Sequence, residues 1–326
     1  MARYLIIRLL HAAVVIWGAA TLVFVILHLA PGDPALNLVG EMANPDQIAM
    51  VRHALGLDQP VHVRYLSYLG DLVAGDLGTS WFVGQSTVAM LAERLPDTIE
   101  LTLTAALIGI PLAVALGIVS AVLRRTPFDY MANTVALFGI STPNFWLGVM
   151  LIMLFAVELR WLPALGRGPF FTEAVAALAH GDAAPLGEWA RYIVLPAITL
   201  GTFLMALITR LTRTDVLENL AKPYVKVARA KGMGRWSVVW SHVVPNSMIS
   251  VATIIGLEVG ALLGGAVVTE TVFAWPGMGR LLVESIHRRD FPVIQAGVLL
   301  TSFIFVFVNI LVDVVYVWLD PRIRLR

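Results

Sequence analysis

LTLTAALIGIPLAVALGIVSAVL, residues 101–123, contains no Asp, Glu, Lys or Arg, and this stretch decides the class of fold. A helix needs about 20 consecutive apolar residues to cross the hydrocarbon core of a bilayer. A buried helix of a soluble protein would instead carry charge every few residues, on the side that faces solvent. Residues 101–123 therefore predict a transmembrane helix.

Five further windows are similarly long and apolar. Four of them are free of charge, and the other, Asn246–Thr269, contains only Glu258. The composition agrees, because 58% of the residues are hydrophobic and 14% are charged, against about 25% charged in soluble domains. We therefore predict an all-α polytopic membrane protein with six transmembrane helices, at roughly 9–30, 99–123, 130–157, 191–211, 246–270 and 296–319.

The basic residues indicate the orientation of these helices. Segments 1–8, 124–129, 210–245 and 320–326 lie on the side of the N-terminus, and they hold fourteen of the 23 Lys and Arg residues in fewer than 60 positions. Short cytoplasmic loops carry the excess of Lys and Arg in membrane proteins. We therefore predict a multi-pass protein of the cell (inner) membrane with both termini cytoplasmic.

The predicted spans divide the chain into four parts. We expect an N-terminal transmembrane helix (1–30), read as an uncleaved span because its apolar stretch exceeds the roughly 7–15 residues of a signal peptide. An extracytoplasmic segment (31–94) follows, which we expect to form a small cap. The rest is a five-span transmembrane domain (95–319) with a large inner loop (212–245), and a cytoplasmic tail (320–326).

Several catalytic motifs are absent from the sequence. A P-loop requires a Gly-Lys pair, which occurs nowhere in the chain, so the chain cannot bind ATP in that way. Cysteine is absent and the seven histidines are scattered, which argues against a metal site. His28 and Asp33 have the His-x4-Asp spacing of some acyltransferases, but the stretch Pro31–Pro34 also serves simply to end the first helix.

The inner loop has a pattern of its own. Segment 210–245 carries seven bases and two acids, and it predicts a helix at 225–232 that ends at Gly232, then a second helix at 236–244. Glycine is favoured just past a helix end because it accepts positive φ. A solvated basic loop is the simple interpretation. Docking on another protein would better explain its apolar residues Val225, Val227, Ala228, Ala230 and Met233.

The stretch Ala228–Gly232 (ARAKG), followed thirteen residues later by Pro245, resembles the "EAA" loop of type I ABC importer permeases. The likeness is closest to the dipeptide, oligopeptide, glutathione and nickel branch, although Lys226 and Val227 stand where the name of the motif has Glu and Ala. Other stretches typical of that branch occur along the whole chain: Pro31–Pro34, Leu55–Asp58, Gly75–Gly78, Ser141–Pro143, Thr269–Gly277, Arg289–Asp290 and Asp320–Arg324.

The resemblance implies a MetI-like fold and a permease subunit that imports di- or oligopeptides, glutathione or a nickel chelate by alternating access. The chain itself would be no enzyme and hold no cofactor. Its implied partners are a second homologous permease, two ATPases that bind ATP and Mg, an extracytoplasmic solute-binding protein and membrane lipid, but no nucleic acid. The residues implied in coupling to the ATPase are Tyr224, Lys226, Ala228, Arg229, Ala230, Lys231, Gly232 and Pro245.

Residues inside the predicted spans are candidates for packing or for the pathway. Small residues let transmembrane helices approach closely, and charged residues in spans usually face an interior or a cavity. Pro143 predicts a kink in the third span, since proline removes a helical hydrogen bond. Glu258 is either part of the pathway wall or a polar contact between helices. The full set of candidates is Gly256, Gly260, Gly264, Pro143, Glu258 and Asp313.

Aromatic and charged residues follow the fifth span on the outer side. The resemblance implies a docking face for the binding protein, and an anchor at the membrane interface is the alternative. These residues are Trp275, Arg280, Arg289 and Asp290.

Two other functions stay open from the sequence. An ion-coupled secondary transporter or channel would work without an ATPase, but it would favour inverted repeats and several mid-membrane charges. An intramembrane acyltransferase-like enzyme would use His28 and Asp33.

Overall fold

The computed structural model describes residues 2–40 and 43–319, and within them it contains helices and a single antiparallel bridge between Thr79 and Ser86. The chain divides into two compact units. The first unit comprises Met1–Asp97 with Gly277–Val306, and the second comprises Thr98–Pro276 with Phe307–Arg326. The prediction of an all-α fold is confirmed.

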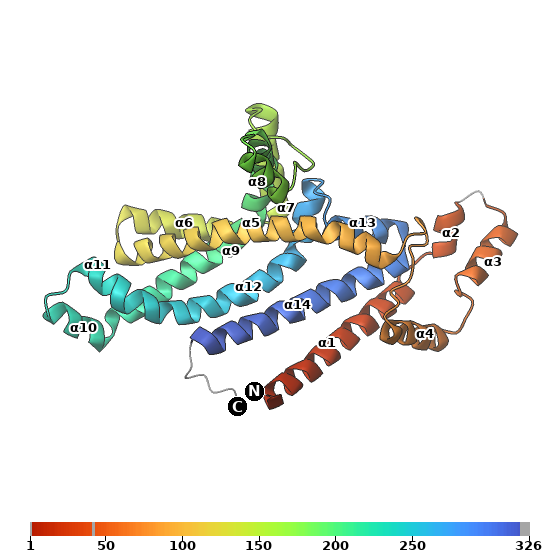
Figure 1. Ribbon diagram of the computed structural model, residues 1–326, viewed down its shortest axis with the longest axis horizontal. Helices are drawn as coiled ribbons and strands as arrows, with labels where there is room; N and C mark the ends of the chain where they lie inside the picture. The colour runs from red at the N-terminus through yellow and green to blue at the C-terminus, as the bar shows by residue number, and fades with distance from the viewer. Residues whose placement is uncertain (1, 41–42, 320–326) are drawn as a thin grey trace. The chain divides into compact units, whose positions relative to one another are not determined.

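The first unit contains five helices of its own and parts of two longer ones. Its helices are α1 (Ala2–Leu29), α2 (Pro34–Val39), α3 (Pro45–Ala54), α4 (Val61–Ala74) and α13 (Met278–Arg288), together with the start of α5 (Thr87–Val122) and of α14 (Phe291–Leu319). Helices α1 and α4 lie side by side (Figure 1) and are joined by a hydrogen bond of 2.7 Å between the hydroxyls of Thr21 and Tyr65.

The second unit is built around the long helix α9 (Ala184–Ala221). Its other helices are α6 (Pro127–Ser141), α7 (Asn144–Leu151) with the π-helical segment η1 (Ile152–Glu158), α8 (Phe171–Ala179), α10 (Pro223–Ala230), α11 (Arg235–Val238) with the π-helical segment η2 (Val239–Val243), and α12 (Val244–Val272). Helices α6, α7, α8 and α12 all contact α9. Most of α5 also belongs to this unit, where it packs on α9.

Small residues allow the close approach of α5 to α9. A Cβ on Gly117 would lie 2.6 Å from Cβ of Thr212, so no side chain fits there. One turn earlier, the hydroxyl of Thr209 donates to the carbonyl of Ala113 over 3.2 Å. Backbone approach through small residues is typical of helices that associate within lipid.

Among the described residues, four helices are long and apolar enough to cross a membrane: Ile6–Leu29, Thr87–Val122, Ala184–Ala221 and Phe291–Val312. The number rises to six if each of two bent pairs is one span, as the sequence predicted. The pair Arg235–Met248 and Ser250–Leu262 is bent by 49°. The predicted third span consists of Pro127–Ser141 and Asn144–Glu158, which meet at 108°.

The bend in the predicted third span is far larger than a proline kink. Thr142 and Pro143 both have extended backbone, with ψ of 123° and 133°. Steric conflict with a proline ring disfavours helical geometry in the preceding residue, so the helix ends before Pro143. Two consecutive extended residues then redirect the chain into α7.

Candidate functional site

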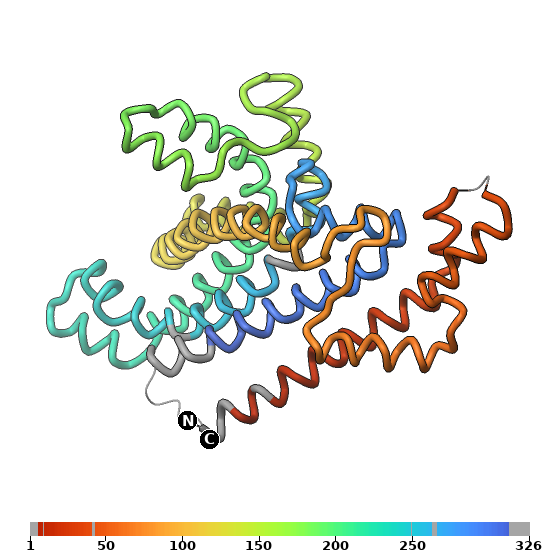
Figure 2. Tube along the Cα trace, turned by 45° about the vertical axis from the view of Figure 1, so that its right-hand side comes forward, coloured from red at the N-terminus to blue at the C-terminus, as the bar shows by residue number. Residues whose placement is uncertain are grey.

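Residues 222–243 form a helical hairpin at the end of α9, made of α10, a turn, and α11 with η2 (Figure 2). The turn depends on Gly232, whose φ of +84° lies in the left-handed region that glycine adopts without strain. Pro223 begins α10, where its missing N–H costs no hydrogen bond. Local sequence therefore accounts for both ends of α10.

One side of the hairpin is part of the core of the second unit. Val225 and Ala228 of α10 are buried, and they belong to one apolar cluster with the ends of α5 and α9. The other buried members of the cluster are Ile118, Ala121, Val122, Val216, Val238, Val239 and Val243. The prediction that the apolar residues of the loop dock on another protein is thus wrong for Val225 and Ala228, because they pack inside the chain itself.

The opposite side of the hairpin is exposed and mixes aromatic with basic residues. Val227, Trp236 and Trp240 expose 55%, 47% and 58% of their surface, so this side of the hairpin presents apolar and aromatic side chains. Four bases share the exposed side: Lys226, Arg229, Lys231 and Arg235. Sequence reasoning missed the two tryptophans, although their i, i+4 spacing predicts a shared helix face.

A buried amide ties the hairpin to the helices on either side of it. The side-chain oxygen of Asn219, at the end of α9, accepts hydrogen bonds of 2.9 Å from Lys222 Nζ and from the hydroxyl of Tyr224. Its Nδ2 donates over 3.1 Å to the hydroxyl of Ser247, near the start of α12. Burial raises the pKa of the Tyr224 hydroxyl, which keeps this group protonated as a donor. Asn219 therefore links the hairpin to both α9 and α12.

Pro245 lies in the first turn of α12, so the predicted second helix does not end at Val244. The chain runs from α11 through η2 into α12 without a loop. A proline has no N–H to donate, and in η2 the N–H of Val244 bonds to the carbonyl of Val239, five residues back. The wider turn keeps the hairpin continuous with α12.

A buried ion pair joins α6 to α9 close to the hairpin. The guanidinium of Arg213 donates two hydrogen bonds to the carboxylate of Asp129, of 2.7 Å and 2.9 Å. Asp129 also accepts from the hydroxyl of Ser120 over 2.6 Å, from Asn133 Nδ2 over 2.8 Å and from the backbone N–H of Arg125 over 2.9 Å. Bidentate pairing of this kind fixes geometry as well as charge.

Comparison with known proteins shows the family of the chain. The family described as "Binding-protein-dependent transport system inner membrane component" matches residues 113–325, and its N-terminal component matches residues 1–102. The chain belongs to this family. It is a permease subunit of an ABC importer, as the resemblance predicted, and the predictions of an inner membrane component and of a protein that is not itself an enzyme are confirmed by the family.

Three relatives illustrate the match. A dipeptide transport system permease protein of Alkalihalophilus pseudofirmus is 42% identical and covers 99% of this permease and 100% of its own length. A di/tripeptide transport system permease protein of Pseudomonas aeruginosa is 40% identical over 94% of each chain. A glutathione transport system permease protein of Salmonella paratyphi A is 40% identical over 100% of each chain. Such systems work with an ATPase and a solute-binding protein.

Part of the predicted docking face of the permease is buried. Trp275 exposes 1% of its surface in the core of the second unit, and Asp290 exposes 3%. The carboxylate of Asp290 accepts hydrogen bonds from the hydroxyl of Ser80 and, over 3.1 Å, from the N–H of Trp81. The prediction of a docking role is therefore wrong for Trp275 and Asp290, which serve the packing of their own units.

The two arginines of the predicted docking face lie nearer to solvent. Arg280 forms an ion pair of 2.8 Å with Glu284, one turn along α13. Arg289 donates to the carbonyl of Pro31 and adopts the left-handed backbone that ends α13. Both side chains are half-buried in the first unit.

The predicted pathway and packing residues differ in their surroundings. Gly256 is buried, and a Cβ there would lie 2.2 Å from Cγ1 of Val312. Gly260 is buried and Glu258 is half-buried, both in α12. No hydrogen bond or ion pair of the Glu258 side chain occurs within the described part of the permease. The surroundings of Gly264 and of the Asp313 side chain lie outside what the structure describes.

The acyltransferase-like pair is not assembled. The carboxylate of Asp33 accepts from the N–H of Ala35 over 3.0 Å at the start of α2, and it pairs with Arg52. The ring of His28 stacks on Phe24 at 6.4 Å. Across residues 2–40 and 43–319, no hydrogen bond joins His28 to Asp33 and no group of three potential metal ligands occurs.

Proposed function

We propose that the helical hairpin 222–243 is where the ATPase acts on this permease. The observation that carries the proposal is its two-sidedness. One side is locked into the second unit by Val225, Ala228 and the contacts of Asn219, while the other presents exposed tryptophan and basic side chains. A movement of the ATPase against the exposed side would displace the hairpin, and the hairpin would transmit the displacement to α9 and α12.

The coupling residues then divide by position. The exposed Lys226, Arg229, Ala230 and Lys231 would contact the ATPase, together with Trp236 and Trp240. Gly232 would shape the turn, Tyr224 and Ala228 would hold the hairpin in place, and Pro245 would carry the movement into α12. Aromatic and arginine side chains are enriched where protein interfaces bind most strongly.

Replacement of Trp240 by serine tests the exposed side. We expect it to weaken the association of the permease with its ATPase and to lower uptake, because an interface aromatic is lost. Trp146 of α7 is the matched control, since it exposes 50% of its surface elsewhere in the second unit. Equal association and uptake in Trp240→Ser, Trp146→Ser and wild type would refute the proposal and leave Trp240 as a membrane-interface anchor.

Gly232 tests the turn independently of the exposed side. Asparagine tolerates positive φ, whereas β-branched valine does not, and open space surrounds the position. We expect Gly232→Asn to keep coupled uptake. We expect a transporter assembled with Gly232→Val to hydrolyse ATP in its ATPase subunits without matching uptake. Equal coupling in both variants would contradict a role of this turn.

Short peptides are the substrate class that we propose. Relatives at 40–42% identity over most or all of their length are named as dipeptide and di/tripeptide permeases, which supports this choice. Glutathione, itself a short peptide, is named for another relative, and a nickel chelate is the remaining candidate. Titration of the partner binding protein with di- and tripeptides, glutathione and nickel tests the proposal, and tight binding of nickel alone would overturn it.

The proposed assembly consists of this permease, a second homologous permease, two ATPases that hold ATP and Mg, and an extracytoplasmic binding protein. The permeases would form the pathway between them and work by alternating access, with Pro143, Glu258 and the glycines of α12 as candidates near it. We propose the segment boundaries 1–30, 31–94, 95–319 and 320–326 with both termini cytoplasmic.

The lack of cysteine makes the orientation simple to measure. Single cysteines at position 226 in the hairpin and at position 53 in α3 would be treated with an impermeant maleimide on intact cells. We expect labelling at position 53 alone. Labelling at position 226 alone would reverse the proposed orientation.

A further inference from the structure

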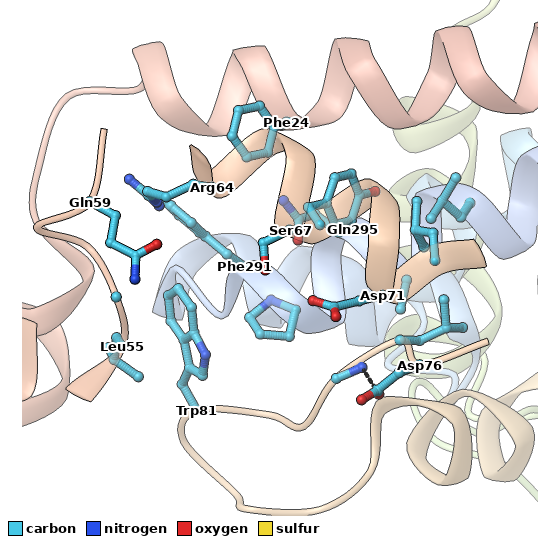
Figure 3. Close-up of a pocket in the computed structure, with 18 of the residues that line it drawn as sticks. Phe24, Leu55, Gln59, Arg64, Ser67, Asp71, Asp76, Trp81, Phe291 and Gln295 are labelled. Atoms are coloured by element: carbon cyan, nitrogen blue, oxygen red, sulfur yellow. Dashed lines mark hydrogen bonds between the residues drawn. The ribbon is translucent and has the colours of Figure 1, made fainter. Parts of the chain in front are cut away.

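The first unit contains a cavity of about 400 Å³ that no part of the proposed coupling mechanism uses. Figure 3 shows its wall, to which α4 contributes Arg64, Ser67 and Asp71, while Trp81 and Phe291 come from the turn before α5 and from the start of α14. A cavity of this volume falls within the range of small-molecule sites.

Aromatic rings make up much of the apolar wall. The rings of Trp81 and Phe291 lie 5.4 Å apart, and those of Phe24 and Tyr68 lie 5.8 Å apart. The hydroxyl of Tyr68 is buried without a hydrogen-bond partner among the described residues, and burial raises its pKa. The wall thus presents aromatic, largely apolar surface, with the Tyr68 hydroxyl buried behind it.

Arg64 is a half-buried cation on the same wall. Within the described ranges, no carboxylate pairs with its guanidinium, and burial lowers its pKa with no opposing contribution from an anion. Arg64 and Phe291 also line a second cavity of about 260 Å³. The carboxylate that lines this second cavity belongs to Asp33, which pairs with Arg52 and not with Arg64. A partly desolvated guanidinium binds a carboxylate strongly, often through two hydrogen bonds.

Asp71 supplies the opposite charge at the other end of the α4 wall, as Figure 3 shows. It lies seven residues after Arg64, which places both on one face of α4 about 10.5 Å apart along the helix axis. The side chain of Asp71 has no ion-pair partner in the described part of the chain. The neighbouring Asp76 is occupied, since it accepts from the N–H of Gly78 over 2.8 Å.

We propose that this cavity binds a short peptide with free termini, its carboxylate on Arg64 and its ammonium group on Asp71. An extended chain spans about 3.3–3.6 Å per residue, so three residues match the separation of the two charges and two residues reach it with side-chain adjustment. The aromatic rings receive the side chains of the peptide. The inference rests on the proposed peptide substrate and adds a receiving site in the first unit, formed by the cap together with Phe24 of α1 and the start of α14.

Trialanine and its blocked forms test the inference on the assembled transporter in lipid nanodiscs without the binding protein. We expect calorimetry to detect binding of trialanine to the transporter. N-acetyl-trialanine and trialanine amide should bind more weakly by a factor of about ten or more, because each loses one charge-assisted contact. Alanine, which cannot span both charges, should also bind weakly. Equal binding of all four compounds, or no binding of trialanine, would overturn the inference.

Two variants locate the binding. Arg64→Gln should lose the preference for trialanine over its amide, and Asp71→Asn should lose the preference over the acetylated form, each with unchanged thermal unfolding. Arg52→Gln is the control, since Arg52 is exposed and already paired with Asp33. Unchanged preferences in both test variants would place the peptide elsewhere and refute the site.

Uptake separates this inference from the proposed function. Vesicles with the complete transporter, binding protein and ATP are given labelled trialanine. Uptake by wild type without selective binding at the cavity refutes the receiving site alone. Absence of uptake for every di- and tripeptide offered refutes the peptide substrate, and with it the inference.

Discussion

Replacement of Asp129 by alanine removes the acceptor of five hydrogen bonds, two of them from Arg213. The Asp129 side chain is 4% exposed and that of Arg213 is 23% exposed, so the variant leaves an arginine charge largely buried without its partner. Loss of one partner of a buried ion pair typically costs about 3–5 kcal/mol. We expect a loss of about 3 kcal/mol, at the lower end, because Arg213 keeps some contact with water.

Thermal unfolding of the permease in detergent, followed through its nine tryptophans, measures this effect. The pair of Arg280 and Glu284, whose side chains are 40% and 46% exposed, is the matched control, and Glu284→Ala should cost only about 0.3–0.5 kcal/mol. The double variant Asp129→Ala with Arg213→Ala should lose less than the sum of the single variants, since neighbours that share hydrogen bonds couple by about 0.5–3 kcal/mol. A small effect of Asp129→Ala, equal to that of Glu284→Ala, or strictly additive single variants would refute the reasoning.

Three further predictions follow from contacts in the second unit. Gly117→Ala places a Cβ 2.6 Å from that of Thr212 and should lower the free energy of unfolding by about 1–3 kcal/mol, measured by thermal unfolding. Gly187→Ala is the control and should be nearly neutral, because no atom lies within 4 Å of the added Cβ. Equal costs of the two variants would contradict the packing of α5 on α9. Asn219→Leu should lower the number of peptides imported per ATP hydrolysed, measured in vesicles, and an unchanged ratio would remove Asn219 from the coupling network. Trp275→Ala should lower the free energy of unfolding by about 3–5 kcal/mol, whereas the folded transporter should keep its affinity for the binding protein. Weakened affinity without loss of stability would restore the docking role of Trp275.

The long helices were predictable because the bilayer imposes one simple requirement on the chain. Helices such as α5 and α9 need apolar side chains along their whole length, so composition reveals them without knowledge of their neighbours. The turn at Gly232 was predictable for a similar reason, since positive φ is a local property that glycine satisfies.

Contacts between distant segments could not be predicted in this way. Asp129 and Arg213 are 84 residues apart, and together they hold α6 against α9. From the sequence, Arg213 was counted only among the bases of the inner loop, and Asp129 was not singled out. Trp275 and Asp290 have the residue types of a docking face, and only the packing of each unit reveals that they are buried. The bend of 108° at Pro143 depends on two consecutive extended residues, whereas a proline by itself predicts only a kink.

The sequence predicted which segment forms the candidate site, but not which of its residues face the core and which face outward. The ARAKG motif located the loop, but its periodicity did not separate the inward Val225 and Ala228 from the outward Val227. Asn219 lies before the motif and has no signal of its own, because its role depends on Ser247 in the next helix.

Uptake of labelled trialanine into vesicles tests most directly whether this permease is driven by ATP through its hairpin. The vesicles contain the permease, its partner permease and the ATPases, with binding protein and peptide on one side and ATP on the other. We predict uptake that requires ATP hydrolysis and that falls to background in Gly232→Val while hydrolysis continues. Uptake that persists without ATP or without the ATPase subunits would contradict the ABC importer mechanism.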